Sequence, residues 1–279
     1  MRKLLPSKRR KEVHKKITVR TFNNDDALED QNTVTFWVHG TGQNPLLRKL
    51  HMSPLGLIKV AQLPEGYGLK RLGMALSIHD GSEFPYHNLY AFGWSGKLSY
   101  KARQTAGEDL ARAIIDTCDA YEQRFGKAPR VRIVSHSHGC NVTLNASDHL
   151  HARQMKVEEL VFMACPVQYA TAHKIGSPVF KEIFALYSSG DILQVMDPQG
   201  LNLEKAMRGD KLFSERRFEP QANLVQAQVW WNNSKLTHVG FVRERFGRAL
   251  PSILAELRAS KDAILAADEH EYIIKVNQP

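Results

Sequence analysis

The chain has 279 residues, 43% of them hydrophobic, which is enough to bury the core of a single α/β domain. Its three cysteines are an odd number and lack Cys-x-x-Cys spacing, which argues against a disulfide framework and against a zinc site. We expect the thiols to be small buried groups in a reducing compartment. The sequence implies no metal and no organic cofactor.

The formal net charge of +9 comes mostly from the first 20 residues, which carry nine Lys or Arg and one Glu. Residues 1–16 are typical of a solvated, disordered tail; the alternative is an electrostatic tether to an anionic membrane, which we favour over nucleic acid as a partner. The tail lacks the apolar run of a secretory signal, and no apolar stretch is long enough to span a bilayer. We therefore expect a cytoplasmic protein, with peripheral membrane association or non-classical export as alternatives.

From residue 17 onward, strand patterns alternate with helical patterns and predict a single domain over 17–279. Strands are expected at 17–21, 33–38, 88–94, 131–135, 159–165, 183–188 and 224–231, and helices at 106–125, 138–155 and 239–266. Alternation of this kind predicts an α/β fold with a mostly parallel central sheet and helices on both faces. The ligand crevice of such a sheet lies at the carboxyl ends of its strands.

Residues 131–142 contain the most informative pattern of the chain. A β-branched run leads directly into Ser-His-Ser-His-Gly over 135–139, and a helical pattern follows at once. This order predicts a strand, a one-residue elbow and a helix, with Ser137 strained at the apex and its hydroxyl above the sheet. Strand and helix nearly touch at such an elbow, so the small residues Ser135 and Gly139 are required beside it. We therefore predict that Ser137 is a nucleophile.

A serine nucleophile needs a base and an acid that orients this base. Among twelve histidines, His238 follows the last predicted strand and precedes the closing helix, which favours it as the base. His39 precedes a tight Gly-x-Gly turn and is interpreted as a loop-shaping residue. Asp191, after the strand at 183–188, is the favoured acid, and Asp197 is its competitor.

The tetrahedral intermediate of acyl transfer needs hydrogen-bond donors for its oxyanion. The backbone N–H of His138, at the start of a predicted helix, is one candidate. The second is the backbone N–H of Thr41, in a His-Gly-Thr-Gly turn over 39–42 that follows the first long strand.

With these residues in this order, the chain resembles the α/β-hydrolases, and specifically their lipase- and esterase-like members. The matching features are the His-Gly-Thr turn, the elbow, and the order Ser137, Asp191, His238. Ser135 departs from the glycine that is usual at the first position of the elbow. The resemblance implies a serine hydrolase that cleaves carboxylic esters through an acyl-enzyme without a cofactor, and a histidine directly after the nucleophile favours acyl esters or lipids.

Two long, apolar segments, residues 45–87 and 192–223, are predicted to form a cap or lid over the acyl pocket. The alternative is that they are ordinary helices packed on the core.

Other functions remain open on the same residues. A thioesterase or an acyltransferase would use the same triad, and a catalytically silent scaffold that acts as a binding protein is the alternative from another class. The pattern leaves the acyl chain length, the headgroup and the oligomeric state open.

Overall fold

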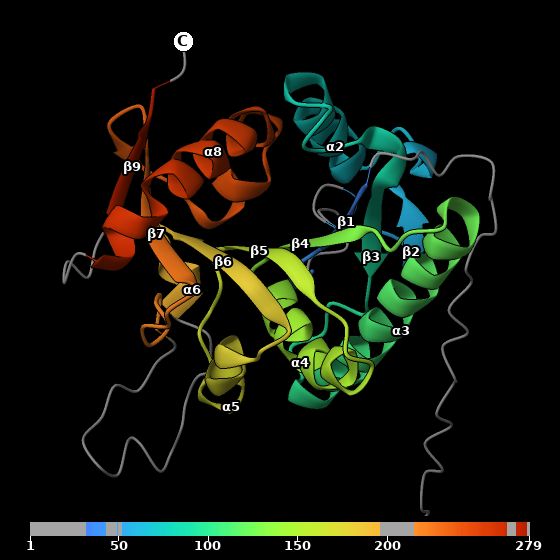
Figure 1. The fold of residues 1–279 in the computed structure, drawn as a ribbon. Helices are drawn as coiled ribbons and strands as arrows, with labels where there is room; N and C mark the ends of the chain where they lie inside the picture. The colour runs from blue at the N-terminus through green and yellow to red at the C-terminus, as the bar shows by residue number, and fades with distance from the viewer. Residues whose placement is uncertain (1–31, 43–48, 50–51, 196–214, 267–271, 278–279) are drawn as a thin grey trace, which may run out of the picture.

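One sheet of nine strands runs through the chain in the computed structural model, which describes residues 32–42, 49, 52–195, 215–266 and 272–277 (Figure 1). The predicted tail at 1–16 and the strand at 17–21 lie outside the described residues.

The centre of the sheet is parallel. Six strands, in the order β3, β1, β4, β5, β6, β7, pair in parallel with their neighbours. Their bounds are β1 Thr33–Val38, β3 Leu89–Gly93, β4 Arg130–His136, β5 Val157–Met163, β6 Phe180–Tyr187 and β7 Leu224–Trp231. An antiparallel strand, β2 (Gly56–Lys59), forms one edge, whereas β8 (Ser234–Lys235) and β9 (Tyr272–Val276) both pair with β7. The predicted α/β class with a mostly parallel sheet is confirmed.

Helices cover both faces of this sheet. Figure 1 shows α3 (Tyr100–Phe125), α4 (His138–Ala152) and the short α5 (Tyr169–Ala172) on one side, and α2 (Gly68–His79) and α8 (Glu244–Ala266) on the other. Alternate residues of each strand enter two separate cores; in β1, Val34 and Phe36 face the core under α3 and α4, and Trp37 faces the core under α2 and α8. Near-continuous apolar strands are what a doubly covered sheet requires.

The helix ends follow local chemistry. The side chain of Ser99 caps α3 by accepting the N–H of Ala102 at 3.4 Å, and α3 ends at Gly126, whose φ of 69° is left-handed. The prediction of a single closing helix over 239–266 is wrong in one respect. A 3-10 helix, η6 (His238–Val242), comes first, and Arg243, whose backbone is extended, separates it from α8.

The two predicted cap segments differ in what the structure describes. In the first, over 45–87, residues 56–59 form β2 and residues 68–79 form α2, which packs against α8 over the second core. The alternative interpretation, core-packing elements, therefore describes these residues. In the second, the structure describes the short helix α6 (Ile192–Val195) and residues 215–223, so a cap there stays a prediction.

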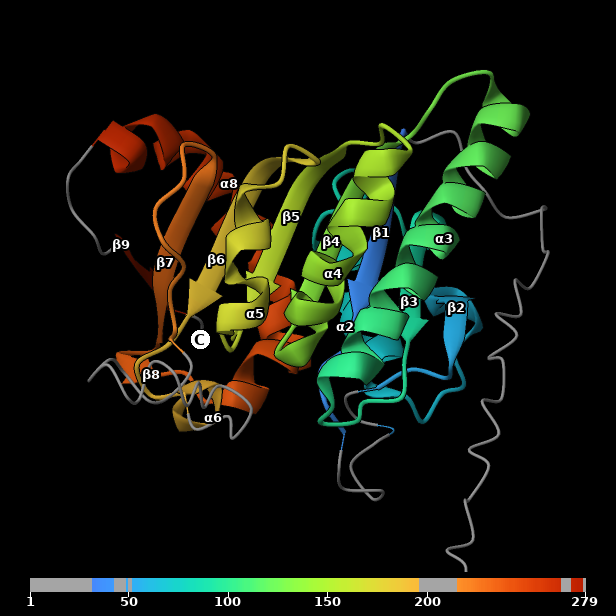
Figure 2. The ribbon, with the colours of Figure 1, turned by 90° about the horizontal axis from the view of Figure 1, so that it is seen from below.

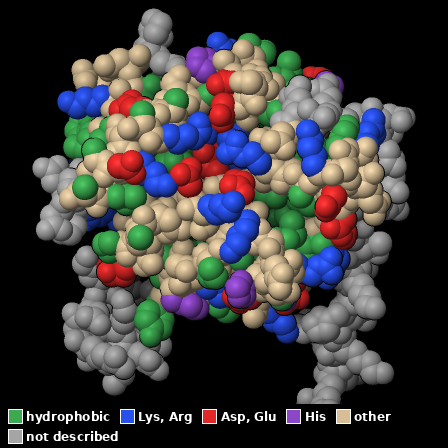
Figure 3. All heavy atoms as spheres, in the orientation of Figure 1, with side chains coloured by type: hydrophobic (Ala, Val, Ile, Leu, Met, Phe, Trp, Pro, Cys, Tyr) green, Lys and Arg blue, Asp and Glu red, His purple; other side chains and the backbone are tan. Residues whose placement is uncertain are grey.

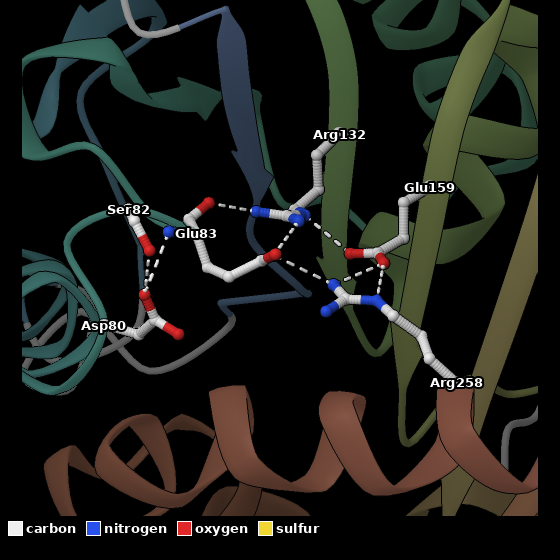
Figure 4. Close-up of polar contacts among 6 residues, drawn as sticks. All are labelled: Asp80, Ser82, Glu83, Arg132, Glu159 and Arg258. Carbon is white, nitrogen blue, oxygen red and sulfur yellow. Dashed lines mark hydrogen bonds and ion pairs between the residues drawn. The ribbon is translucent and has the colours of Figure 1, made fainter.

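Four charged side chains connect α8 to the sheet and to the loop after α2. Arg132 on β4 contacts Glu159 on β5 at 2.6 Å and Glu83 at 2.5 Å, and Arg258 on α8 contacts the same two carboxylates at 2.6 and 3.0 Å (Figure 4). The set holds two positive and two negative charges, which offsets the cost of burying Arg132 and Glu159. Because Arg132 is the third residue of β4, the cluster lies well before the strand end that carries Ser137.

The surface of the folded part carries both signs of charge. Figure 3 shows Lys and Arg side chains next to Asp and Glu side chains across the middle of one face. No large field of one sign covers this face, in agreement with a net charge that belongs mainly to the first 20 residues.

Candidate active site

Ser137 is the whole connection between β4 and α4. Its φ is 54° and its ψ is −133°, a region that residues with a side chain rarely adopt and that costs about 1–3 kcal/mol. Two backbone hydrogen bonds hold it there: its N–H donates to Met163 O on β5 at 2.9 Å, and its carbonyl accepts the N–H of Cys140 at 3.0 Å. The predicted one-residue, strained elbow is confirmed.

The two small residues beside the elbow have different tasks. A Cβ on Gly139 would lie 2.5 Å from Val38 O and 2.6 Å from His39 O, so the close approach of α4 to the end of β1 needs glycine. Ser135 is fully buried, and its Oγ lies 2.7 Å from Thr143 Oγ1. Because Thr143 donates its own proton to Gly139 O, Ser135 is the donor to Thr143. A hydroxyl is therefore tolerated at the usual glycine position because it has a partner.

The structure brings the predicted serine, histidine and aspartate together. His238 Nε2 lies 2.9 Å from Ser137 Oγ, and His238 Nδ1 lies 2.7 Å from Asp191 Oδ2. The carboxylate can only accept, so Nδ1 carries a proton and Nε2 is left to accept the serine proton. The competing acid, Asp197, lies outside the described residues.

The carboxylate of Asp191 is fully buried and has a second partner that sequence reasoning missed. Oδ1 of Asp191 accepts a hydrogen bond from the backbone N–H of Gln194 at 3.0 Å. The backbone carbonyl oxygen of Asp191 accepts one from the side chain of Arg216 at 3.2 Å. Gln194 in turn donates through Nε2 to Cys165 O at 2.7 Å, which ties α6 to the end of β5. Figure 2 shows α6 beyond the arrowhead of β6, at the edge where the parallel strands end. The spacing Asp-x-x-Gln, typical of a helix start, was the available signal.

His39 shapes the loop after β1, as expected, and the hydrogen bonds identify its tautomer. Trp94 N–H donates to His39 Nε2 at 3.2 Å, so Nδ1 carries the proton and donates to Gly40 O at 2.6 Å. The indole of Trp94 also donates to His39 O at 2.8 Å, and the two rings stack at 5.9 Å. In a trans peptide the N–H points opposite to the C=O, so the N–H of Thr41 points away from the His39 ring.

The loop after β1 also lies directly against the elbow. A Cβ on Gly40 would come within 2.7 Å of Ser137 Cβ, so the chain passes Ser137 at a distance that only glycine permits. His138, the other predicted oxyanion residue, is the first residue of α4, where helix N–H groups point outward along the axis.

The remaining candidate groups do not build a second centre in the described part. There, no three His, Cys, Asp or Glu side chains gather as metal ligands, and none of the helices has both the length and the apolar composition to cross a membrane. The three cysteines are free and buried; burial raises the pKa of Cys118 to about 12 and raises that of Cys140 well above its usual value.

Comparison with known proteins gave no matching family model and no similar curated protein. Among solved structures, the chain is similar to an arylesterase (12% identity, 85% of this chain and 77% of that chain, TM-score 0.45) and to an esterase of Pyrobaculum calidifontis (14%, 84% and 77%, TM-score 0.41). A mutant of the esterase rPPE is similar at 10% identity, over 86% and 77% of the two chains, with a TM-score of 0.39. At these values the likeness carries no argument about activity, which has to be inferred from the site itself.

Proposed function

We propose that this chain is a serine hydrolase that cleaves carboxylic esters through an acyl-enzyme, with Ser137 as nucleophile, His238 as base and Asp191 as the acid that orients it. One observation carries the proposal: a continuous relay from Asp191 Oδ2 through His238 to Ser137 Oγ, with contacts of 2.7 and 2.9 Å, ends on a serine strained at an elbow. A buried structural serine would need neither the strain nor the relay.

The reaction follows from the donors and acceptors of the relay. Ser137 Oγ attacks the ester carbonyl carbon while its proton moves to His238 Nε2, and the negative charge of Asp191 stabilises the imidazolium. His238 then gives this proton to the departing alkoxide, which leaves an acyl group on Ser137. Water, deprotonated by His238, attacks the acyl carbonyl, and the acid leaves as Ser137 regains its proton.

The oxyanion would be held by the backbone N–H groups of Thr41 and His138. In support, the hydrogen bond from His39 to Gly40 O orients the peptide that carries the Thr41 N–H, and His138 begins α4. Such preorganised donors stabilise charge as it forms and do not have to reorient during the reaction.

An apolar ester, as for a lipase, a phospholipase or an esterase of hydrophobic esters, is the substrate class we favour. Next to Asp191, the α6 residues Ile192 and Leu193 are 60% and 66% exposed, so apolar side chains are available at the strand-end edge to contact an acyl or alcohol chain. Attraction of the basic tail to an anionic membrane would place the enzyme near such substrates.

A fluorophosphonate probe and a series of p-nitrophenyl esters test this function. We expect the wild-type protein to be labelled, and Ser137→Ala to abolish labelling and to lower ester turnover by a factor on the order of 10⁴ or more. The matched control is Ser252→Ala, since Ser252 Oγ is also hydrogen-bonded to a histidine, His79, at 3.1 Å, but is exposed on α8. Full labelling of the control and no labelling of Ser137→Ala support the proposal; a folded wild-type protein that is neither labelled nor active overturns it and favours the silent scaffold.

A further inference from the structure

His136, the residue directly before the nucleophile, lies between the two loops that complete the site. It is the last residue of β4 and is 5% exposed. Resting on the function proposed above, we propose that His136 is a positioning residue that holds His238 in the orientation required for proton transfer.

The first contact of His136 is a hydrogen bond to the backbone of the base. Its Nε2 lies 3.0 Å from the carbonyl oxygen of His238, 102 residues away in the sequence. A carbonyl can only accept, so Nε2 carries a proton and donates it. His238 is the first residue of η6, and the peptide that follows it is fixed by this bond at the point where the imidazole branches from the chain.

The second contact is between the two rings. The centroids of the His136 and His238 rings are 4.7 Å apart and the ring planes are tilted by 49°, within the range of aromatic pairs. Asp191 and Ser137 hold the two nitrogen edges of His238, but two edge contacts alone leave the imidazole free to tip out of its plane. The ring of His136 limits this motion because it packs beside His238.

The third contact reaches the other loop of the site. A Cβ on Gly40 would lie 3.2 Å from His136 Nδ1, so the imidazole of His136 borders the loop that carries the Thr41 N–H. One side chain therefore borders the loop that carries the Thr41 N–H, adjoins Ser137 in the sequence and donates a hydrogen bond to the backbone of His238. We infer that it sets the spacing among all three, and a misplacement of about 1 Å in such a constellation costs up to about 100-fold in rate.

Two substitutions separate the hydrogen bond from simple space filling. His136→Phe keeps an aromatic ring of similar size and removes the donor, whereas His136→Gln keeps an N–H donor of similar reach and removes the ring. For a p-nitrophenyl ester we expect His136→Phe to lower kcat by about 10- to 100-fold with little change in KM. We expect His136→Gln to recover most of this loss, because the hydrogen bond to the backbone of His238 fixes its orientation more strongly than the ring contact does. The matched controls, His149→Phe and His149→Gln, change an exposed histidine on α4 and are expected to retain wild-type kcat.

A second readout does not depend on turnover. We expect the proton on His238 Nδ1, held by Asp191, to give a low-field NMR resonance that reports on this hydrogen bond. We expect this resonance to weaken in His136→Phe and to return in His136→Gln. Thermal melting checks that each variant is folded. The inference is overturned if both folded variants keep kcat within about twofold and an unchanged resonance, or if His136→Gln is as impaired as His136→Phe. A wild-type protein that hydrolyses no ester overturns the proposed function instead, and the resonance then still tests the role of His136.

Discussion

The strained backbone of Ser137 predicts that glycine is unusually well tolerated there in comparison with alanine. Both Ser137→Ala and Ser137→Gly remove the hydroxyl and its contact with His238, so this loss cancels when the two are compared. They differ in that alanine must adopt a φ of 54° and a ψ of −133°, whereas glycine does so without steric cost. The comparison therefore measures the strain.

The magnitude follows from a comparison with a serine within the adjoining helix, α4. Ser147 is fully buried within α4, and its hydroxyl donates to Leu144 O at 2.7 Å. At that helical position, glycine in place of alanine costs about 1 kcal/mol in propensity and about 0.8 kcal/mol for the lost methyl group. At position 137 similar costs are opposed by the relief of strain, about 1–3 kcal/mol. The free energy of unfolding of the glycine variant minus that of the alanine variant should therefore be more favourable at position 137 than at position 147, by about 1–3 kcal/mol.

Urea unfolding followed by tryptophan fluorescence gives the free energy of unfolding of the four variants. Equal Gly-minus-Ala differences at the two positions would refute the reasoning, because the elbow would then store no backbone strain. A change in the denaturant dependence of any variant would show instead that its unfolded or native state had changed in compactness.

Three further predictions concern the acid, the elbow and the charge cluster. Asp191→Asn should lower kcat by about 10⁴-fold while leaving fluorophosphonate labelling detectable but slow, since the base loses its orientation; unchanged kinetics would remove Asp191 from the relay. Gly139→Ala should lower the free energy of unfolding by about 1–3 kcal/mol and impair turnover, because its Cβ would meet two backbone carbonyls at 2.5 and 2.6 Å; wild-type melting and kinetics would contradict this. Burial raises the pKa of Glu83, but the two guanidinium groups beside it outweigh this effect and lower its pKa below the usual value. Its contribution to stability is therefore present at neutral pH and is lost as the pH falls through the lowered pKa, so the melting temperatures of wild type and Glu83→Gln should converge in acid; a constant difference down to pH 3 would contradict it.

The sequence predicted the strands and helices whose patterns are local. β1 is a mostly apolar run, β4 contains the β-branched residues Val131, Ile133 and Val134, and α3 ends before Gly126, so each could be identified from its own residues. The elbow was equally local, since Ser137 directly separates a strand pattern from a helical one. These elements needed no information about distant contacts.

The elements that were missed depend on tertiary contacts. α2 contains Gly73, which lowers its helix propensity, but a Cβ there would lie 2.6 Å from Val60 and 2.8 Å from Leu89, so the glycine permits close packing of the helix on the sheet. β9 has five residues and gains its partner, β7, only through pairing across about forty residues of chain. Neither contact is visible in a local pattern.

The same division holds within the candidate site. Ser137, Asp191 and His238 could be proposed because each follows a predicted strand, and the parallel sheet brings such positions to one edge. The hydrogen bond of Gln194 to Asp191 is local and could have been read from the Asp-x-x-Gln spacing. The hydrogen bond of His136 could not be predicted, since it spans 102 residues and depends on a carbonyl oxygen of His238 that has no sequence signature.

The departure at Ser135 shows what the elbow motif requires physically. Its hydroxyl is accommodated because it donates to Thr143 at 2.7 Å, so this position demands a small residue whose polar atom is satisfied, rather than glycine itself. Gly139 differs because any Cβ there meets the carbonyls of Val38 and His39, and these belong to the strand end that leads into the oxyanion loop. Relief of that clash would move the loop away from Ser137, so a substitution of Gly139 should lower stability and catalysis together. A substitution of Ser135 does not press on this loop, so its effects on stability and on catalysis should not be coupled.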